Sequence, residues 1–151
     1  MSSGKVHARH SVLLVIPTVF AVDMALGLIT AGGAAIGCGV LGQVLSPDLD
    51  QQDLTRSDWL VLRRLGPLGG LFVAWFFPYA WLVPHRHWAS HAPVIGTVGR
   101  VLYMALLPAL FVWWKQYTLS FPPLFVQFLF GLFLGLCVSD IAHWIADGFP
   151  L

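Results

Sequence analysis

Histidine and aspartate side chains that could bind a metal ion are gathered in a few short motifs of this sequence. The densest motif is segment 85–91, HRHWASH, which holds three histidines in seven residues. If this segment is helical, His87 and His91 lie on one face, because residues four apart are neighbours on a helix surface. Two imidazole nitrogens placed in this way can coordinate one ion. The alternative for this motif is a group of histidines at a membrane surface without an ion.

A second motif lies near the C-terminus and combines two aspartates with a histidine. Asp140, His143 and Asp147 occupy positions i, i+3 and i+7 of one helical stripe, and the residues between them are apolar. Ionisable groups at the end of a membrane helix are unfavourable unless they are hydrated, paired or bound to metal. A hydrated helix cap explains Asp147 alone, whereas a metal site explains the whole stripe.

Two further motifs are common outside metal sites when each is taken alone. Segment 46–50, SPDLD, has two carboxylates after a proline, which is typical of a turn in which aspartates cap backbone groups. His7 and His10 stand three residues apart at the start of the first apolar run. Together, however, the four motifs contain all six histidines of the chain. A set of imidazoles and carboxylates without thiolate suits Zn²⁺, Mn²⁺ or iron.

We therefore predict a divalent metal site with one or two ions, Zn, Mn or Fe. Its predicted ligands come from all four motifs and are His7, Asp48, Asp50, His85, His91, His143 and Asp147. These donors exceed one tetrahedral shell, so two ions are an alternative to one. If the site is hydrolytic, Asp50 or Asp140 is the predicted general base. Arg86 is then the predicted clamp for a phosphate or carboxylate, because a guanidinium pairs with these groups through two hydrogen bonds.

The composition indicates that a small membrane protein positions these motifs. Of the 151 residues, 58% are hydrophobic and 10% are charged. A soluble domain has roughly 45–50% apolar and about 25% charged residues, so the composition excludes a soluble globular enzyme and a disordered chain. The net charge of +1 provides no basic surface for nucleic acid. We predict one domain, 1–151, without a disulfide, since Cys38 and Cys137 lie in separate apolar runs.

The predicted fold is an all-α polytopic membrane bundle of four transmembrane helices and one interfacial or re-entrant helical segment, residues 59–83. A crossing needs roughly 20 helical residues. The four predicted crossings are approximately residues 11–29, 31–45, 93–114 and 122–145. Gly32 and Gly33 are predicted to form the tight turn between the first two crossings. Gly131 and Gly135 form a G-x-x-x-G pair in the last crossing, and we expect it to bring another helix of the same bundle close.

The metal-binding motifs all fall on one side of the membrane if segment 59–83 does not cross it. The loop on the opposite side has only Lys115 as a basic residue. The basic residues on the side of the motifs are Lys5, Arg9, Arg56, Arg63, Arg64 and Arg86. By the positive-inside rule, we predict that the metal site and both termini face the cytoplasm. Asp23 is predicted inside the first crossing, and Arg100 near an end, from which its side chain can snorkel to the surface.

In order and spacing, the four motifs resemble those of a family of small bacterial membrane proteins, the uncharacterised metal-binding proteins of the cyanobacterial type. This family is related to the LexA-binding inner-membrane metal-dependent hydrolase-like proteins. The matching segments are 3–7 (SGKVH), 47–50 (PDLD), 85–86 (HR) with 90–91 (SH), and 143–147 (HWIAD). Ala8 stands where the family often has Asp after the opening histidine, and His10 and His87 match no family position.

The resemblance implies an integral protein of the bacterial inner membrane, plasma or thylakoid, that acts as a metal-dependent hydrolase. Such a protein has the lipid bilayer as its partner, and we predict a lipid-like or phosphorylated substrate that arrives in the membrane plane. The alternative is a non-catalytic accessory subunit of a larger membrane complex, in which a structural metal joins the helix ends. A haem or chlorophyll protein is disfavoured, because the histidines lie at the ends of apolar runs and not within them.

Overall fold

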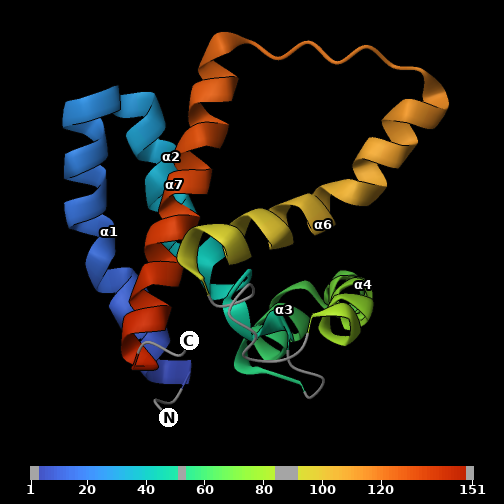
Figure 1. The fold of residues 1–151 in the computed structure, drawn as a ribbon, viewed down its shortest axis with the longest axis horizontal. Coiled ribbons are helices and arrows are strands. Elements are labelled where there is room, and N and C mark those ends of the chain that lie inside the picture. The colour runs from blue at the N-terminus through green and yellow to red at the C-terminus, as the bar shows by residue number, and fades with distance from the viewer. Residues whose placement is uncertain (1–3, 51–53, 84–91, 149–151) are drawn as a thin grey trace.

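The computed structural model describes residues 4–50, 54–83 and 92–148, and the side chains in these ranges except those of residues 4–8, 50 and 56. This part of the chain contains helices and no strand, so the predicted all-α class is confirmed (Figure 1). The elements in chain order are α1 (Gly4–Leu26), α2 (Leu28–Gly39), the 3₁₀ turns η1 (Leu41–Gln43) and η2 (Pro47–Asp50), α3 (Arg56–Leu65), α4 (Pro67–Leu82), α6 (Pro93–Lys115) and α7 (Pro123–Ala146).

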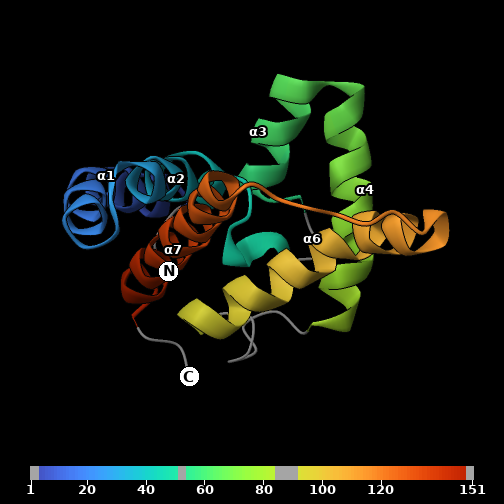
Figure 2. The same ribbon diagram turned by 90° about the horizontal axis from the view of Figure 1, so that it is seen from above.

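The helices α1, α2 and α7 lie side by side and form a bundle (Figures 1 and 2). The chain reverses between α1 and α2 at Gly27, whose φ of 87° is readily adopted only by glycine. The prediction of a turn at Gly32 and Gly33 is therefore wrong, since both residues lie inside α2. Asp23 lies in the last turn of α1, within the apolar stretch Arg9–Leu26, and its side chain is exposed.

Glycines bring the backbones of α2 and α7 into direct contact. The glycines of this contact are Gly33 and Gly37 on α2 and Gly131 and Gly135 on α7. A Cβ atom on Gly33 would collide with the carbonyl oxygen of Phe128, and one on Gly131 would collide with that of Thr30. The expected use of the G-x-x-x-G pair inside the bundle is thus confirmed, and Gly33 has a packing role in place of the predicted turn.

Polar side chains join α1 to this pair of helices. The hydroxyls of Ser11 on α1 and Ser139 on α7 are 2.9 Å apart and share a hydrogen bond. The thiol of Cys38 on α2 donates to the carbonyl oxygen of Ser11 at 3.2 Å. Cys38 and Cys137 are both buried and free, and no disulfide was predicted between them. These contacts set the register of α1 against α7 near the end of the bundle where α1 begins and α7 ends.

Segment 59–83 does not form a single helix, because α3 and α4 are separated by Gly66 at a φ of 55°. At the start of α3, the hydroxyl of Thr55 accepts a hydrogen bond from the backbone of Asp58, and the Asp58 carboxylate accepts one from the backbone of Thr55 at 2.8 Å. The two helices lie across the axes of α1, α2 and α7, near the end where α1 begins and α7 ends (Figures 1 and 2). With 16 residues, α4 is shorter than the roughly 20 residues that a crossing needs.

Three helices in the described part of the chain are long and apolar enough to cross a membrane: Arg9–Leu26 of α1, Pro93–Lys115 and Pro123–Ala146. The predicted crossing at 31–45 is not confirmed as a fourth. The reason is that α2 ends at Gly39 after 12 residues and the chain continues into short 3₁₀ turns. Apolar composition therefore extends beyond the regular helix in this run.

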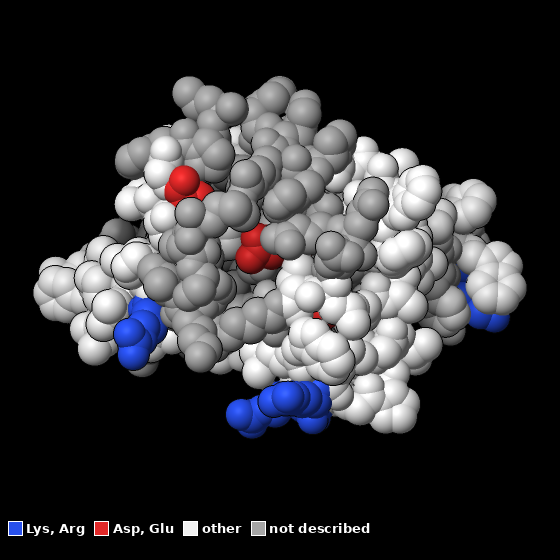
Figure 3. All heavy atoms as spheres, turned by 90° about the horizontal axis from the view of Figure 1, so that it is seen from below, with Lys and Arg blue, Asp and Glu red and all other residues white. Residues whose placement is uncertain are grey.

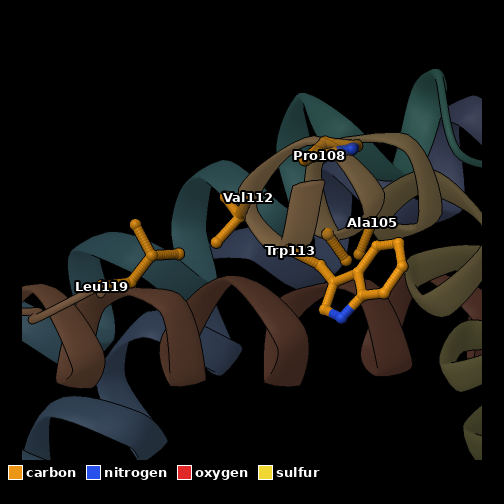
Figure 4. A pocket seen from close by; sticks show the side chains of 6 residues that line it. Ala105, Pro108, Val112, Trp113 and Leu119 are labelled. Atoms are coloured by element: carbon orange, nitrogen blue, oxygen red, sulfur yellow. The ribbon is translucent and has the colours of Figure 1, made fainter. Parts of the chain in front are cut away.

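The helix α6 meets α7 in its first half and then leaves it, and the connection to α7 returns across the gap (Figure 1). Pro108 lies inside the half that departs from α7. A hollow of about 390 Å³ lies there, lined by Ala105, Pro108, Ala109, Val112, Trp113 and Leu119 (Figure 4). Its lining is apolar and contains none of the predicted metal ligands.

Alanine substitutions at two adjacent glycines test the contact between α2 and α7. Gly33→Ala inserts a methyl group against the backbone of α7, so we expect the free energy of unfolding to fall by about 1–3 kcal/mol. Gly32→Ala is the matched control, since among the described residues no atom lies within 4 Å of its added Cβ. We expect this control to be neutral or up to about 1 kcal/mol more stable, because alanine favours helix. Thermal unfolding in detergent, followed by circular dichroism, measures both; equal effects would contradict the contact.

Candidate metal centre

Three of the predicted ligands meet at the end of α7. The imidazole of His143 is buried in the last turn of this helix. Its Nε2 atom lies 3.5 Å from Oδ1 of Asp48 and 3.2 Å from Oδ2 of Asp147. One histidine is thereby placed between two carboxylates that come from separate parts of the chain.

The position of Asp48 depends on the short turn η2. The next residue, Leu49, is buried in an apolar cluster with Leu45, Phe76, Tyr79 and Leu136. This cluster joins the turn to α4 and α7, so the burial of Leu49 holds η2 against the end of α7. Asp48 is then directed to His143.

The position of Asp147 depends on the end of α7. Its backbone N–H donates to the carbonyl oxygen of His143 at 3.0 Å, which continues the helical hydrogen bonding by one residue past Ala146. Gly148 follows with a φ of 79°, a conformation that commonly ends a helix. The spacing of four residues keeps the Asp147 carboxylate on the face of His143.

A second polar cluster lies one turn earlier on α7. Oδ2 of Asp140 accepts hydrogen bonds from the guanidinium of Arg100 and the hydroxyl of Thr97, both on α6. All three side chains are at most 2% exposed. Oδ1 of Asp140 is buried and has no hydrogen-bond partner among the described residues. The predicted snorkelling of Arg100 is wrong, because this side chain forms a buried ion pair inside the protein.

Thr97 and Arg100 were not predicted from the sequence as partners of Asp140. The sequence contains one indication of this contact. Arg100 is an ionisable residue within an apolar run, and Thr97 has a hydroxyl three residues before it on the same helical face. The partner itself lies 40 residues away in the sequence, and no local pattern indicates it. In this arrangement Asp140 joins α6 to α7 through one oxygen, and its role as a general base stays a prediction.

The remaining predicted residues cannot be placed as side chains. His85, Arg86 and His91 lie outside the described residues, as does His87. His7 lies in α1 and Asp50 lies in η2, but their side chains are also outside the description. His10, which was not predicted as a ligand, is exposed on α1.

The donors around His143 match a metal site in type and do not complete one. One imidazole and two carboxylates are the nitrogen and oxygen donors that suit Zn²⁺, Mn²⁺ or iron. Within the described ranges, however, no group of three or more His, Cys, Asp or Glu side chains is arranged to hold an ion. A metal at this position therefore needs donors from residues such as His7, His85 and His91.

Two substitutions test the buried pair between α6 and α7. Arg100→Met leaves a buried carboxylate without its cation, so we expect the free energy of unfolding to fall by about 3–5 kcal/mol. Replacing both partners, as Arg100→Met with Asp140→Leu, removes the uncompensated charge and should recover most of this loss. Denaturation in detergent measures the effect, with Lys115→Met as a control for the loss of an exposed cation. A double variant as unstable as the single variant would contradict the pairing.

Comparisons with known proteins bear on this site only through the family. No curated protein and no solved structure matches the chain. The family model described as "Uncharacterized metal-binding protein (DUF2227)" matches residues 2–150. This match covers almost all of the sequence and includes every motif from which the metal site was predicted. The chain therefore belongs to the DUF2227 family of uncharacterized metal-binding proteins.

Proposed function

We propose that this protein is an integral membrane protein that holds a divalent metal ion at the end of the bundle of α1, α2 and α7. The observation that carries the proposal is the buried imidazole of His143, which faces Asp48 and Asp147 at 3.5 and 3.2 Å. Imidazole and carboxylate are the preferred ligands of the ions considered. The family description is metal-binding, which supports the same conclusion.

The register of α1 supports His7 as a further ligand. Ser11 on α1 shares a hydrogen bond with Ser139 on α7. His7 precedes Ser11 by four residues, and His143 follows Ser139 by four. Because the two helices run in opposite directions, both histidines lie about one turn beyond this contact, toward the same end of the bundle.

The proposed site takes its other donors from two connections. Asp50 ends the turn η2 that carries Asp48. His85 and His91 belong to the connection between α4 and α6. Since α6 meets α7 through Arg100 and Asp140, this connection leads to a helix that packs next to His143.

Two observations support the proposed membrane insertion: the three long apolar helices, and the apolar side chains exposed along them. The basic residues of the sequence concentrate on the side of the proposed site, which supports a cytoplasmic location for the site and both termini. The membrane we propose is the plasma or thylakoid membrane of a bacterial cell.

We further propose that the site hydrolyses a lipid-like or phosphorylated substrate. The side chains of Asp48 and Asp147 are 24% and 22% exposed, so water and a substrate can reach the carboxylates that flank His143. A divalent ion bound at such a site supplies Lewis-acid activation of water. Arg86 is the proposed clamp for the substrate's anionic group. If Asp50 does not bind the ion, it is a better candidate than Asp140 for the general base, because Arg100 and Thr97 already engage Asp140.

Elemental analysis of the full chain, purified in mild detergent, tests the metal site. We expect one or two equivalents of Zn, Mn or Fe, with His143→Ala and His91→Ala losing the ion. Asp48→Asn should weaken binding, since it removes a carboxylate ligand beside the central imidazole. His10→Ala is the matched control and should keep the ion, because this exposed histidine is not a proposed ligand. Full metal content in His143→Ala would contradict the site.

Assays of the metal-loaded protein distinguish a hydrolytic site from a site that holds a structural metal. We expect phosphate-ester or phospholipid hydrolysis that Arg86→Gln lowers without loss of the ion. A loaded protein that is inactive on all such substrates, and whose stability falls when the ion is chelated, would favour the accessory-subunit alternative.

A further inference from the structure

The hairpin of α3 and α4 has an outward face that combines cationic and apolar side chains. On α3 this face carries Trp59 and Leu60, which are 52% and 38% exposed, and the exposed Arg63 and Arg64. Each apolar residue lies four positions before an arginine, so the two kinds of side chain form one stripe along the helix. The opposite face of α3 carries the buried Val61, against which Gly69 of α4 packs.

The arginines of this face, Arg63 and Arg64, have no ionic partner among the residues that the structure describes. The one acid of α3, Asp58, is buried and caps the start of the helix through Thr55. The outward face therefore presents positive charge and no described carboxylate.

The exposed apolar surface continues past the arginines into α4. Leu65, Leu68 and Leu71 are between 54% and 68% exposed on either side of Gly66. A surface of leucine, tryptophan and arginine without acids is typical of helices that lie in the boundary between lipid headgroups and acyl chains. Arginines on such a helix bind anionic headgroups.

The hairpin is also placed where such a boundary would lie. It lies across the bundle axes, near the end at which α1 begins and α7 ends (Figures 1 and 2). Seen from below, basic side chains stand at the outer edge of the molecule, whereas acidic ones lie nearer the middle (Figure 3). The hairpin thus extends sideways from the bundle, over the area that surrounding lipid would occupy.

We infer that the outward face of the α3–α4 hairpin binds the anionic headgroups of the surrounding bilayer through Arg63 and Arg64. Trp59 and the leucines beside Gly66 enter the boundary of the acyl chains. The inference rests on the membrane location in the proposed function and is independent of the metal. Its consequence is that anionic lipid stabilises the hairpin, and with it the apolar cluster that holds η2 against α7.

Amide hydrogen exchange of the full chain in lipid nanodiscs tests this inference. The discs contain phosphatidylcholine alone or phosphatidylcholine mixed with phosphatidylglycerol. We expect the amides of α3 to exchange more slowly in the anionic discs, by about fivefold for each arginine and about 25-fold for both. Arg63→Gln with Arg64→Gln should abolish the difference between the two lipids. Lys115→Gln is the matched control, because it removes an exposed cation on another helix, and it should behave as the unaltered chain.

Several results would overturn the inference. Exchange of α3 that is equal in the two lipids would do so, as would a lipid effect that survives the double substitution. Protection that appears in both lipids and rises with the number of copies in each disc would assign the face to a second copy of this chain. The amides of α7 provide a separate readout: if they exchange rapidly in every disc, the proposed membrane location itself fails.

Discussion

Direct contact between the backbones of α2 and α7 determines where the polar motifs of this chain lie. Gly33 and Gly131 each face a carbonyl oxygen of the opposite helix, and the space between glycine and oxygen is too small for a Cβ atom. The same register continues to Gly42, which packs against Ser139 on α7. The chain therefore reaches η2 beside the last turn of α7, and Asp48 comes to face His143. The small residues of this contact therefore bring the carboxylate of Asp48 next to the imidazole of His143, almost 100 residues away in the sequence.

The second constraint is the cost of burying charge between α6 and α7. An arginine and an aspartate in an apolar interior are tolerated only as a pair, and Arg100 and Asp140 satisfy this condition together with Thr97. The pair holds the first half of α6 against α7. The far half of α6 has no comparable polar contact with α7 among the described residues, and it departs from that helix.

Helical class and the short-range motifs could be predicted from the sequence, since both depend on local composition and spacing. The stripe of Asp140, His143 and Asp147 follows from helical periodicity. Hydropathy alone allowed segment 59–83 to cross the membrane, and only the expected gathering of the motifs on one side favoured an interfacial or re-entrant segment. Helix ends were less predictable: Gly32 and Gly33 resemble a turn, yet the turn forms at Gly27, because Gly33 is needed where α7 approaches. The pairing of Arg100 with Asp140 joins distant parts of the chain and depends on a fold that hydropathy does not specify. The role of the predicted ligands stays a prediction, although the structure brings three of them together.

X-ray absorption at the metal edge of the loaded protein decides whether His143 binds a metal ion, because it reports the atoms bound to the ion. We expect a shell of nitrogen and oxygen donors at about 2.0–2.1 Å for zinc, with multiple-scattering features of imidazole and no sulfur. The imidazole signal should decrease in His143→Ala if any ion is retained. A shell with sulfur, or a spectrum without imidazole that this substitution leaves unchanged, would contradict a metal site built on His143.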